Sequence, residues 1–223
     1  MIPENGIILV DKPSHMTSFG VVARLRRVLS EQQGKRAKVG HTGTLDPFAT
    51  GLMIIVTGTE CRNASHYTKL DKVYEATIRL GQTSTTGDPE GDITEPESQK
   101  ARKLESKDMA KALQSFVGEI TQTPPIFSAI KINGRRAYDL AREGKTVEMP
   151  ERQVTVYSLE IIDYQYPDLK IRTHVSSGTY IRSLAVDIGA ALGTGAYCTE
   201  LRRTRIADYD IAQAHILADF GVH

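Results

Sequence analysis

A glycine-rich loop over residues 40–51 carries the side chains best suited to chemistry. The loop reads GHTGTLDPFATG and offers the carboxylate of Asp46, the hydroxyls of Thr42 and Thr44, and the imidazole of His41. Glycine and proline constrain its backbone, so the loop can hold one side chain at a fixed angle while another molecule approaches closely. It lacks the Gly-Lys-Ser/Thr ending of a phosphate-binding loop, which argues against a nucleoside triphosphate as ligand.

Asp46 also has a purely structural interpretation. It precedes Pro47, which pushes its backbone toward extended geometry. Asp-Pro pairs often open a turn that the aspartate side chain caps. Local spacing alone therefore leaves both a catalytic role and a turn-forming role open.

Hydrophobic periodicity predicts the elements that position this loop. The apolar runs 6–10 and 52–56 are typical of short buried strands, one well before the loop and one directly after it. Between the two runs, a helix is expected from Thr17 or Ser18 to Ser30. Its apolar face at helical spacing consists of Phe19, Val22, Leu25, Val28 and Leu29.

The rest of the chain predicts further strands and helices. Residues 73–80 alternate, with Tyr74, Ala76, Ile78 and Leu80 on one face. Several strands with few βαβ crossovers indicate an α+β fold, a mixed and largely antiparallel sheet flanked by helices. Nothing marks a domain boundary, so residues 1–223 are interpreted as a single domain. The other expected elements are a helix from Ser106, an extended segment 123–134, a short basic helix 135–143, strands 153–162 and 168–176, a helix 178–193 and a strand near 197–209.

The charged residues are separated along the chain although the net charge is only +1. Residues 24–38 carry a local charge of +5, residues 131–145 carry +3, and residues 88–97 carry −5. Such separation suits a protein with one basic face for nucleic acid. Solvated helix faces would give the same pattern.

Cysteine usage and the amino terminus indicate the compartment. Cys61 and Cys198 are the only cysteines and form no CxxC pair, so both are expected to be reduced thiols in a cytoplasmic protein. The amino terminus lacks the pattern of a signal peptide. No apolar run approaches the ~18 residues of a membrane span, so no membrane is expected as a partner.

Six sequence blocks resemble one enzyme family. The string GHTGTLDPFATGLM resembles the catalytic motif of the pseudouridine synthases of the TruB type. Five other blocks, one before this string and four after it, also resemble blocks of the family, and the six stand in the family's order over nearly the whole chain. The threonine-glycine-aspartate in 81–93 resembles the bacterial transfer-RNA branch more than the guide-RNA-dependent branch. The other blocks are GIILVDKPSHMTS, KVYEATIRLGQTSTTGDPEGDI, PPIFSAIKINGRRAYDLAREG, VSSGTYIRSLAVDIGAALG and AYCTELRRTRIADY.

The resemblance implies a substrate and a domain plan. It implies the pseudouridine synthase fold and isomerisation of uridine 55, in the T-loop of transfer RNA, to pseudouridine. It also implies an RNA-gripping insertion near 123–150 that contacts the T-arm. Many family members carry a further RNA-binding domain, but the chain stops at His223, shortly after the last block. A catalytic domain without a separate C-terminal RNA-binding domain is expected, and both a naturally short protein and a shortened one remain open. The protein is also expected to be a monomer.

The resemblance also implies roles for single residues. Asp46 matches the nucleophile, Arg182 the arginine that pairs with it, and Tyr74 the tyrosine that stacks on the flipped uracil and helps to remove the C5 proton. The remaining matches are His41, which fills the space left by the base; Tyr180 and Leu201, which line the uracil pocket; Lys131 and Tyr138, which grip RNA; and Asp88, which supports the site or contacts RNA.

These roles agree with the needs of the reaction. No atom enters or leaves when uridine becomes pseudouridine, so no metal or redox cofactor is expected. A carboxylate can hold the detached sugar covalently, and an adjacent guanidinium keeps that carboxylate ionised and fixes its direction. Attack at C1′ and attack at C6 both remain open.

Other interpretations compete with this one. Without the resemblance, Tyr74 would be assigned to the core, Arg182 to a surface salt bridge, and Lys131 and Tyr138 to ordinary surface and packing positions. A non-catalytic RNA-binding or RNA-chaperone protein is the main alternative, although pure binding has no need of Asp46. A small glycoside hydrolase would need a second carboxylate partner, and no motif supplies one.

Overall fold

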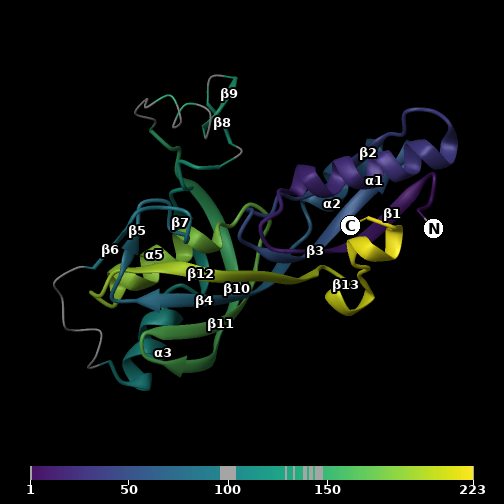
Figure 1. The fold of residues 1–223 in the computed structure, drawn as a ribbon. Coiled ribbons are helices and arrows are strands. Elements are labelled where there is room, and N and C mark those ends of the chain that lie inside the picture. The colour runs from purple at the N-terminus through teal and green to yellow at the C-terminus, as the bar shows by residue number, and fades with distance from the viewer. Residues whose placement is uncertain are drawn as a thin grey trace. The chain divides into compact units, whose positions relative to one another are not determined.

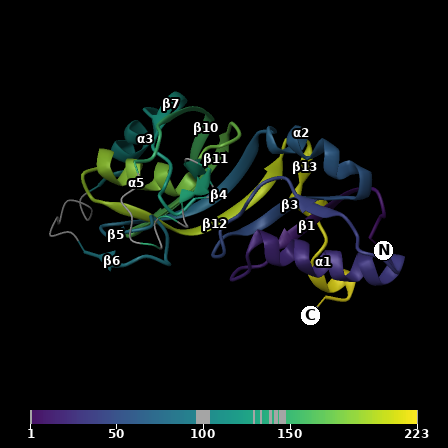
Figure 2. The same ribbon diagram turned by 90° about the horizontal axis from the view of Figure 1, so that it is seen from above.

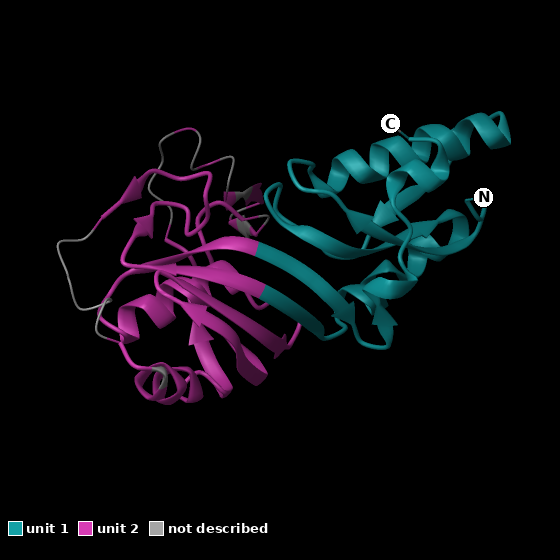
Figure 3. Cartoon of the chain, turned by 60° about the horizontal axis from the view of Figure 1, so that its bottom comes forward, with its two compact units in different colours: residues 1–75, 201–223 teal, residues 76–200 magenta. Residues whose placement is uncertain are grey.

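The computed structural model describes residues 2–95, 104–128, 130–132, 134–137, 140, 143 and 148–222. The chain divides into two compact units (Figure 3). The terminal unit consists of Met1–Glu75 and Leu201–His223, and the central unit of Ala76–Glu200. Strands β4 (Lys72–Leu80) and β12 (Ala196–Ile206) each run from one unit into the other. A single catalytic domain stays a prediction.

The terminal unit is built around three neighbouring strands, β1, β3 and β12. β1 pairs antiparallel with β3, and β12 pairs with β3 in parallel. The predicted strand 52–56 is confirmed, and its side chains are all buried. The elements of this unit besides β4 and β12 are β1 (Gly6–Lys12), α1 (Ser18–Gln33), β2 (Val39–His41), β3 (Thr50–Thr57), η1 (Gly58–Asn63), α2 (Ala64–Thr68), β13 (Tyr209–Asp210), η3 (Ile211–Gln213) and η4 (Leu217–Phe220).

Helix α1 lies beside β2 (Figure 1). The predicted cap is confirmed, because the Thr17 hydroxyl accepts the Gly20 N–H at 2.9 Å. Gly34 ends the helix in the left-handed region, at φ 65°. The predicted burial of Phe19 is wrong: 62% of this residue is exposed. Ser18 is buried in its place, because its hydroxyl bonds the backbone of the loop that follows β2.

The central unit continues the sheet in the order β12, β4, β11, β10, β7. β10 pairs antiparallel with both β11 and β7. Helix α3 contacts β10 and α5, and Figure 2 shows the two helices beside each other. The elements here are β5 (Thr83–Ser84), β6 (Ile93–Thr94), α3 (Ser106–Gln114), β7 (Gly118–Gln122), β8 (Lys131–Ile132), β9 (Arg135–Arg136), β10 (Arg152–Gln165), β11 (Asp168–Val175) and α5 (Ile181–Ala191).

The basic segment near 135 differs from its prediction. A helix was expected over 135–143, but β9 pairs antiparallel with β8 in a small hairpin that projects from the unit (Figure 1). Gly134 lies in the left-handed region, at φ 84°, where the chain reverses. Ala137 and Leu140 are helical. Apart from the β5–β6 and β8–β9 pairs, the described strands form a mixed, mostly antiparallel sheet with helices packed on it, which confirms the α+β fold.

Candidate active site

The loop between β2 and β3, residues 42–49, carries Asp46 and is anchored on both sides of it. The Ser18 hydroxyl donates to the Leu45 carbonyl at 2.9 Å and accepts the Leu45 N–H at 2.8 Å. Leu45 and Ala49 are buried, and Asp46 between them is half-buried. Because Leu45 before Asp46 and Ala49 three residues after it are buried, the Asp46 side chain leaves a backbone segment that is held at both ends.

Asp46 opens a tight turn. Its carbonyl accepts the Ala49 N–H at 3.2 Å, so Pro47 occupies the second position of the turn, which proline favours. The Ser14 hydroxyl holds the same turn by donating to the Phe48 carbonyl at 3.1 Å. The backbone therefore has the turn that the sequence allowed, and a catalytic role for the side chain stays a prediction.

A fully buried lysine clamps this turn. The Lys12 ammonium donates to the carbonyls of Pro13 at 2.8 Å, Met16 at 2.6 Å and Pro47 at 3.2 Å. A buried cation is costly unless it is hydrogen-bonded, and these three carbonyls meet that need. Lys12 thereby joins the end of β1 to the turn that carries Asp46.

A buried arginine holds the beginning and end of the loop together. The Arg203 guanidinium donates to the Gly43 carbonyl at 3.1 Å and to the Leu52 carbonyl at 2.7 Å. Gly51 lies opposite Arg203 in the parallel pairing of β3 with β12. A Cβ at Gly51 would lie 2.3 Å from the Arg203 carbonyl oxygen, so this close approach of two strands requires glycine.

Three other predicted site residues belong to the terminal unit. His41 ends β2 and is half-buried, Tyr74 lies on the buried face of β4 with 8% of it exposed, and Leu201 is buried on β12. Near Tyr74, the Lys72 ammonium donates to the carbonyls of Thr68 and Leu70. The pKa of Lys72 is lowered to about 8, first by burial and then by the charge of Arg203, while Asp71 opposes the shift.

A buried ion pair joins two predicted residues of the central unit. One guanidinium nitrogen of Arg182 donates to the Asp88 carboxylate at 2.9 Å and to the Thr86 carbonyl at 3.0 Å. Another donates to the Phe127 carbonyl at 2.8 Å. The other Asp88 oxygen accepts the Thr86 hydroxyl at 2.6 Å and the Glu90 N–H at 3.0 Å. Asp88 therefore fixes the direction of the arginine, as a supporting residue would.

A buried glutamine fixes the residue that precedes α5. The Gln122 side chain accepts the Tyr180 N–H at 2.7 Å and donates to the Tyr180 carbonyl at 2.9 Å. The Arg152 guanidinium lies over the Tyr180 ring, 5.6 Å from its centroid. These two hydrogen bonds fix Tyr180 at the start of α5, and Arg182 lies two residues after Tyr180.

The two RNA-gripping residues are only partly described. Lys131 lies in β8, opposite Arg136 in β9, and Tyr138 lies outside the described residues. Within the described part of the chain, no helix is long and apolar enough to span a membrane. The same residues contain no group of three or more His, Cys, Asp or Glu side chains that could hold a metal ion.

Sequence reasoning missed Lys12, Arg203 and Gln122. Lys12 falls on the buried register of β1, in line with Ile8 and Val10, and Arg203 falls on the buried register of β12. A charge on the buried register of a strand indicates a buried, hydrogen-bonded cation, so this signal was present. Gln122 gave no comparable signal, because its partner is backbone 58 residues away.

Family models match the chain in two adjacent segments. Residues 26–181 match the model of the TruB family pseudouridylate synthase, N-terminal domain, and residues 182–222 match the tRNA pseudouridylate synthase B C-terminal domain. The chain belongs to the TruB family. Members of this family are isomerases. The C-terminal match covers residues that the sequence analysis assigned to the catalytic domain.

Individual relatives agree with membership of the TruB family. The chain is 44% identical over 222 residues to the tRNA pseudouridine synthase B of Corynebacterium efficiens, covering 98% of this chain and 72% of the relative. It is 45% identical over 208 residues to the corresponding protein of Phocaeicola vulgatus, covering 92% and 87%. A chain in the crystal structure of a Cbf5-Nop10-Gar1 complex matches with a TM-score of 0.73 at 30% identity, covering 97% of this chain and 53% of that chain.

Proposed function

We propose that this chain isomerises uridine 55 in the T-loop of transfer RNA to pseudouridine, with Asp46 as the nucleophile. Relatives over 40% identical along nearly the whole chain are named tRNA pseudouridine synthase B. The observation that carries the proposal is the anchoring of the family's motif loop, which fixes the backbone on both sides of Asp46.

The reaction exchanges one bond of the sugar for another. The C1′–N1 bond breaks, the base turns, the C1′–C5 bond forms, C5 loses a proton and N1 gains one. The Asp46 carboxylate holds the substrate while the base turns. We assign Arg182 to that carboxylate as the guanidinium that keeps it ionised, and Asp88 and the Phe127 carbonyl to the orientation of Arg182.

Access to a stacked base requires extrusion of the nucleotide. Flipping costs a few kcal/mol, and stacking on an aromatic ring returns about 1–3 kcal/mol. Tyr74 is assigned to that stacking, His41 to the space vacated by the base, and Tyr180 and Leu201 to the walls of the uracil pocket. RNA is recognised mainly through loop shape and splayed bases, which suits a rigid T-loop.

A synthetic T-arm hairpin tests this function. We expect the protein to convert uridine 55 of the hairpin to pseudouridine, at a rate within about a hundredfold of that on full transfer RNA, because the loop supplies the shape that is read. Mass spectrometry after carbodiimide treatment locates the product. The control is a hairpin with cytidine at that position. Absence of pseudouridine in both the T-arm hairpin and full transfer RNA, or its formation only at other positions, would refute the proposal.

Substitutions of Tyr74 separate stacking from packing. Tyr74→Phe keeps the aromatic face and Tyr74→Leu loses it, so the leucine variant should be slower than the phenylalanine variant by about 5- to 150-fold, the equivalent of 1–3 kcal/mol of stacking. If the hydroxyl helps to move the C5 proton, the phenylalanine variant is itself slow in a single turnover with saturating RNA. Near-normal rates for both variants would show that Tyr74 only packs in the core.

A further inference from the structure

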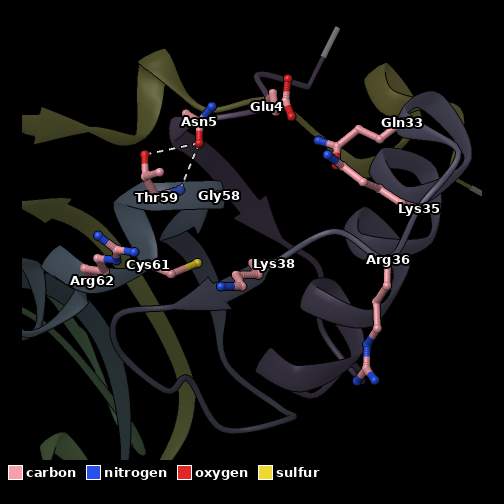
Figure 4. Close-up of a pocket in the computed structure, with 10 residues that line it drawn as sticks. All are labelled: Glu4, Asn5, Gln33, Lys35, Arg36, Lys38, Gly58, Thr59, Cys61 and Arg62. Carbon is pink, nitrogen blue, oxygen red and sulfur yellow. Dashed lines mark hydrogen bonds between the residues drawn. The ribbon is translucent and has the colours of Figure 1, made fainter.

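A basic cavity of about 360 Å³ lies in the terminal unit, where the end of α1 meets β2 and η1. Figure 4 shows Lys38 at its centre, with Cys61 and Arg62 on one side and Arg36 on the other. The cavity is lined by four cations and one carboxylate: Lys35, Arg36, Lys38, Arg62 and Glu4, together with Asn5, Gln33, Gly58, Thr59 and Cys61.

The wall that carries the cations is a fixed strand-like segment. Ala37 and Val39 are buried, so the alternating Arg36 and Lys38 are exposed. The Ala37 N–H donates to the Ser30 hydroxyl of α1 at 3.0 Å. This segment is thereby held on the helix, and both of its cations are open to solvent.

The opposite wall is tied to the same segment. The Gly58 N–H donates to the Lys38 carbonyl at 2.9 Å. The Asn5 side-chain oxygen accepts both the N–H and the hydroxyl of Thr59, at 2.8 and 3.1 Å (Figure 4). A Cβ on Gly58, at φ 55°, would lie 2.2 Å from that same oxygen, so the wall is closely packed.

The lining of this cavity keeps an excess of positive charge, since four cations face the single carboxylate of Glu4. Among the described residues, no carboxylate lies within 4.0 Å of the charged nitrogens of Lys35, Arg36, Lys38 or Arg62. The neighbouring Glu60 accepts the Tyr67 hydroxyl at 2.8 Å. Exposed cations gathered around one cavity create a positive potential that attracts anions.

We propose that this cavity is a binding site for the backbone phosphates of the RNA substrate, separate from the loop that carries Asp46. The proposal rests on the proposed function, which supplies RNA as the polyanion. The cavity and the loop lie at opposite ends of the β2–β3 ladder: Gly58 N–H bonds Lys38 at one end, and the loop follows His41 at the other. From Lys38 to Thr42 the chain spans about 13 Å at 3.3 Å per residue, so a phosphate held here belongs to a nucleotide other than the one that reacts.

Removal of two cations tests the site directly. The Arg36→Gln/Lys38→Gln double variant should bind full transfer RNA roughly tenfold more weakly, and its slope of log affinity against log salt should fall by about 1.4–1.8, the equivalent of two phosphate contacts. The matched control is Lys107→Gln/Lys111→Gln, which removes the same charge from exposed positions on α3. Affinity and slope equal to those of this control would overturn the proposal.

Cys61 supplies a second readout at the cavity itself. It lines the cavity and is half-buried, whereas the other cysteine, Cys198, is buried. Alkylation is measured at alkaline pH, because burial raises the pKa of the Cys61 thiol; a Cys61→Ser variant identifies its signal. Transfer RNA should slow alkylation of the parent by severalfold, and that protection should be lost in the Arg36→Gln/Lys38→Gln variant.

Two outcomes of the alkylation experiment would overturn the proposal. One is equal alkylation with and without transfer RNA under conditions where binding is complete. The other is protection by millimolar inorganic phosphate as full as that by RNA, which would indicate a small-anion site. A parent protein that binds and protects but forms no pseudouridine would refute the proposed function and leave this RNA site standing.

Discussion

Replacing Asp46 with asparagine is expected to abolish isomerisation while RNA binding remains measurable. The amide keeps the shape of the side chain and removes the anion that attacks the nucleoside. Loss of a nucleophile in other enzymes lowers the rate by about 10⁴-fold or more. The carbonyl of residue 46 still accepts the Ala49 N–H, and the flanking anchors Leu45 and Ala49 are unchanged. The loss should therefore appear in the chemical step.

The measurement is a single-turnover rate at saturating T-arm hairpin beside the dissociation constant for the same RNA. Asp210→Asn is the matched control, because Asp210 is an exposed aspartate of the same unit that caps a short helix, and asparagine caps equally well. We expect the control to keep the parent rate. Residual activity of the Asp46 variant within tenfold of the parent would contradict its assignment as the nucleophile.

Local sequence signals predicted the framework of the terminal unit well. The Thr17 cap and the alternation of β4 are local properties, read from residues within a few positions of one another. The burial of Phe19 was predicted wrongly because helical spacing alone does not fix where the edge of the buried face of α1 lies. The long-range bond from Ser18 to Leu45 decides which stripe faces inward.

In the hairpin near 135, a local turn signal prevails over the helix that the sequence analysis expected. The sequence Asn-Gly at 133–134 is the strongest short-range hairpin signal, and Gly134 has the positive φ that such a turn requires. The prediction of a helix over 135–143 did not take this turn signal into account. Here the turn determines the conformation of Arg135 and Arg136, which form β9.

The supports of the site could not be predicted from local signals, because their partners are distant in the chain. Arg203 bonds carbonyls 151 and 160 residues away, and Arg182 pairs with Asp88 94 residues away. By itself, Arg182 read as a surface residue beside the apolar face of its helix. The family resemblance assigned it to the site, and the structure gives the reason that it is buried: Asp88 and two carbonyls receive its guanidinium.

Replacing Arg182 with lysine should impair the enzyme almost as badly as loss of the nucleophile, although the charge is kept. A guanidinium reaches several acceptors in one plane, and here it reaches Asp88, the Thr86 carbonyl and the Phe127 carbonyl. A lysine ammonium lacks that planar fork and cannot reproduce these directions. We expect a single-turnover rate lower by at least about 10³-fold with saturating RNA, in line with the cost of misplacing a catalytic group.

Asp88→Asn separates the stability of this pair from its part in catalysis. The side chains of Arg182 and Asp88 are 3% and 5% exposed, and removal of one partner of a buried pair costs about 3–5 kcal/mol of unfolding free energy. Asparagine still accepts from Arg182, so the loss should fall at the lower end of that range, and the rate should fall less than in Arg182→Lys because the guanidinium remains. Denaturant unfolding gives the free energies, and rates are taken well below the unfolding temperature of each variant.

If Arg182→Lys binds RNA weakly yet isomerises at the parent rate once saturated, then Arg182 is a phosphate contact and its assignment to the Asp46 carboxylate is wrong.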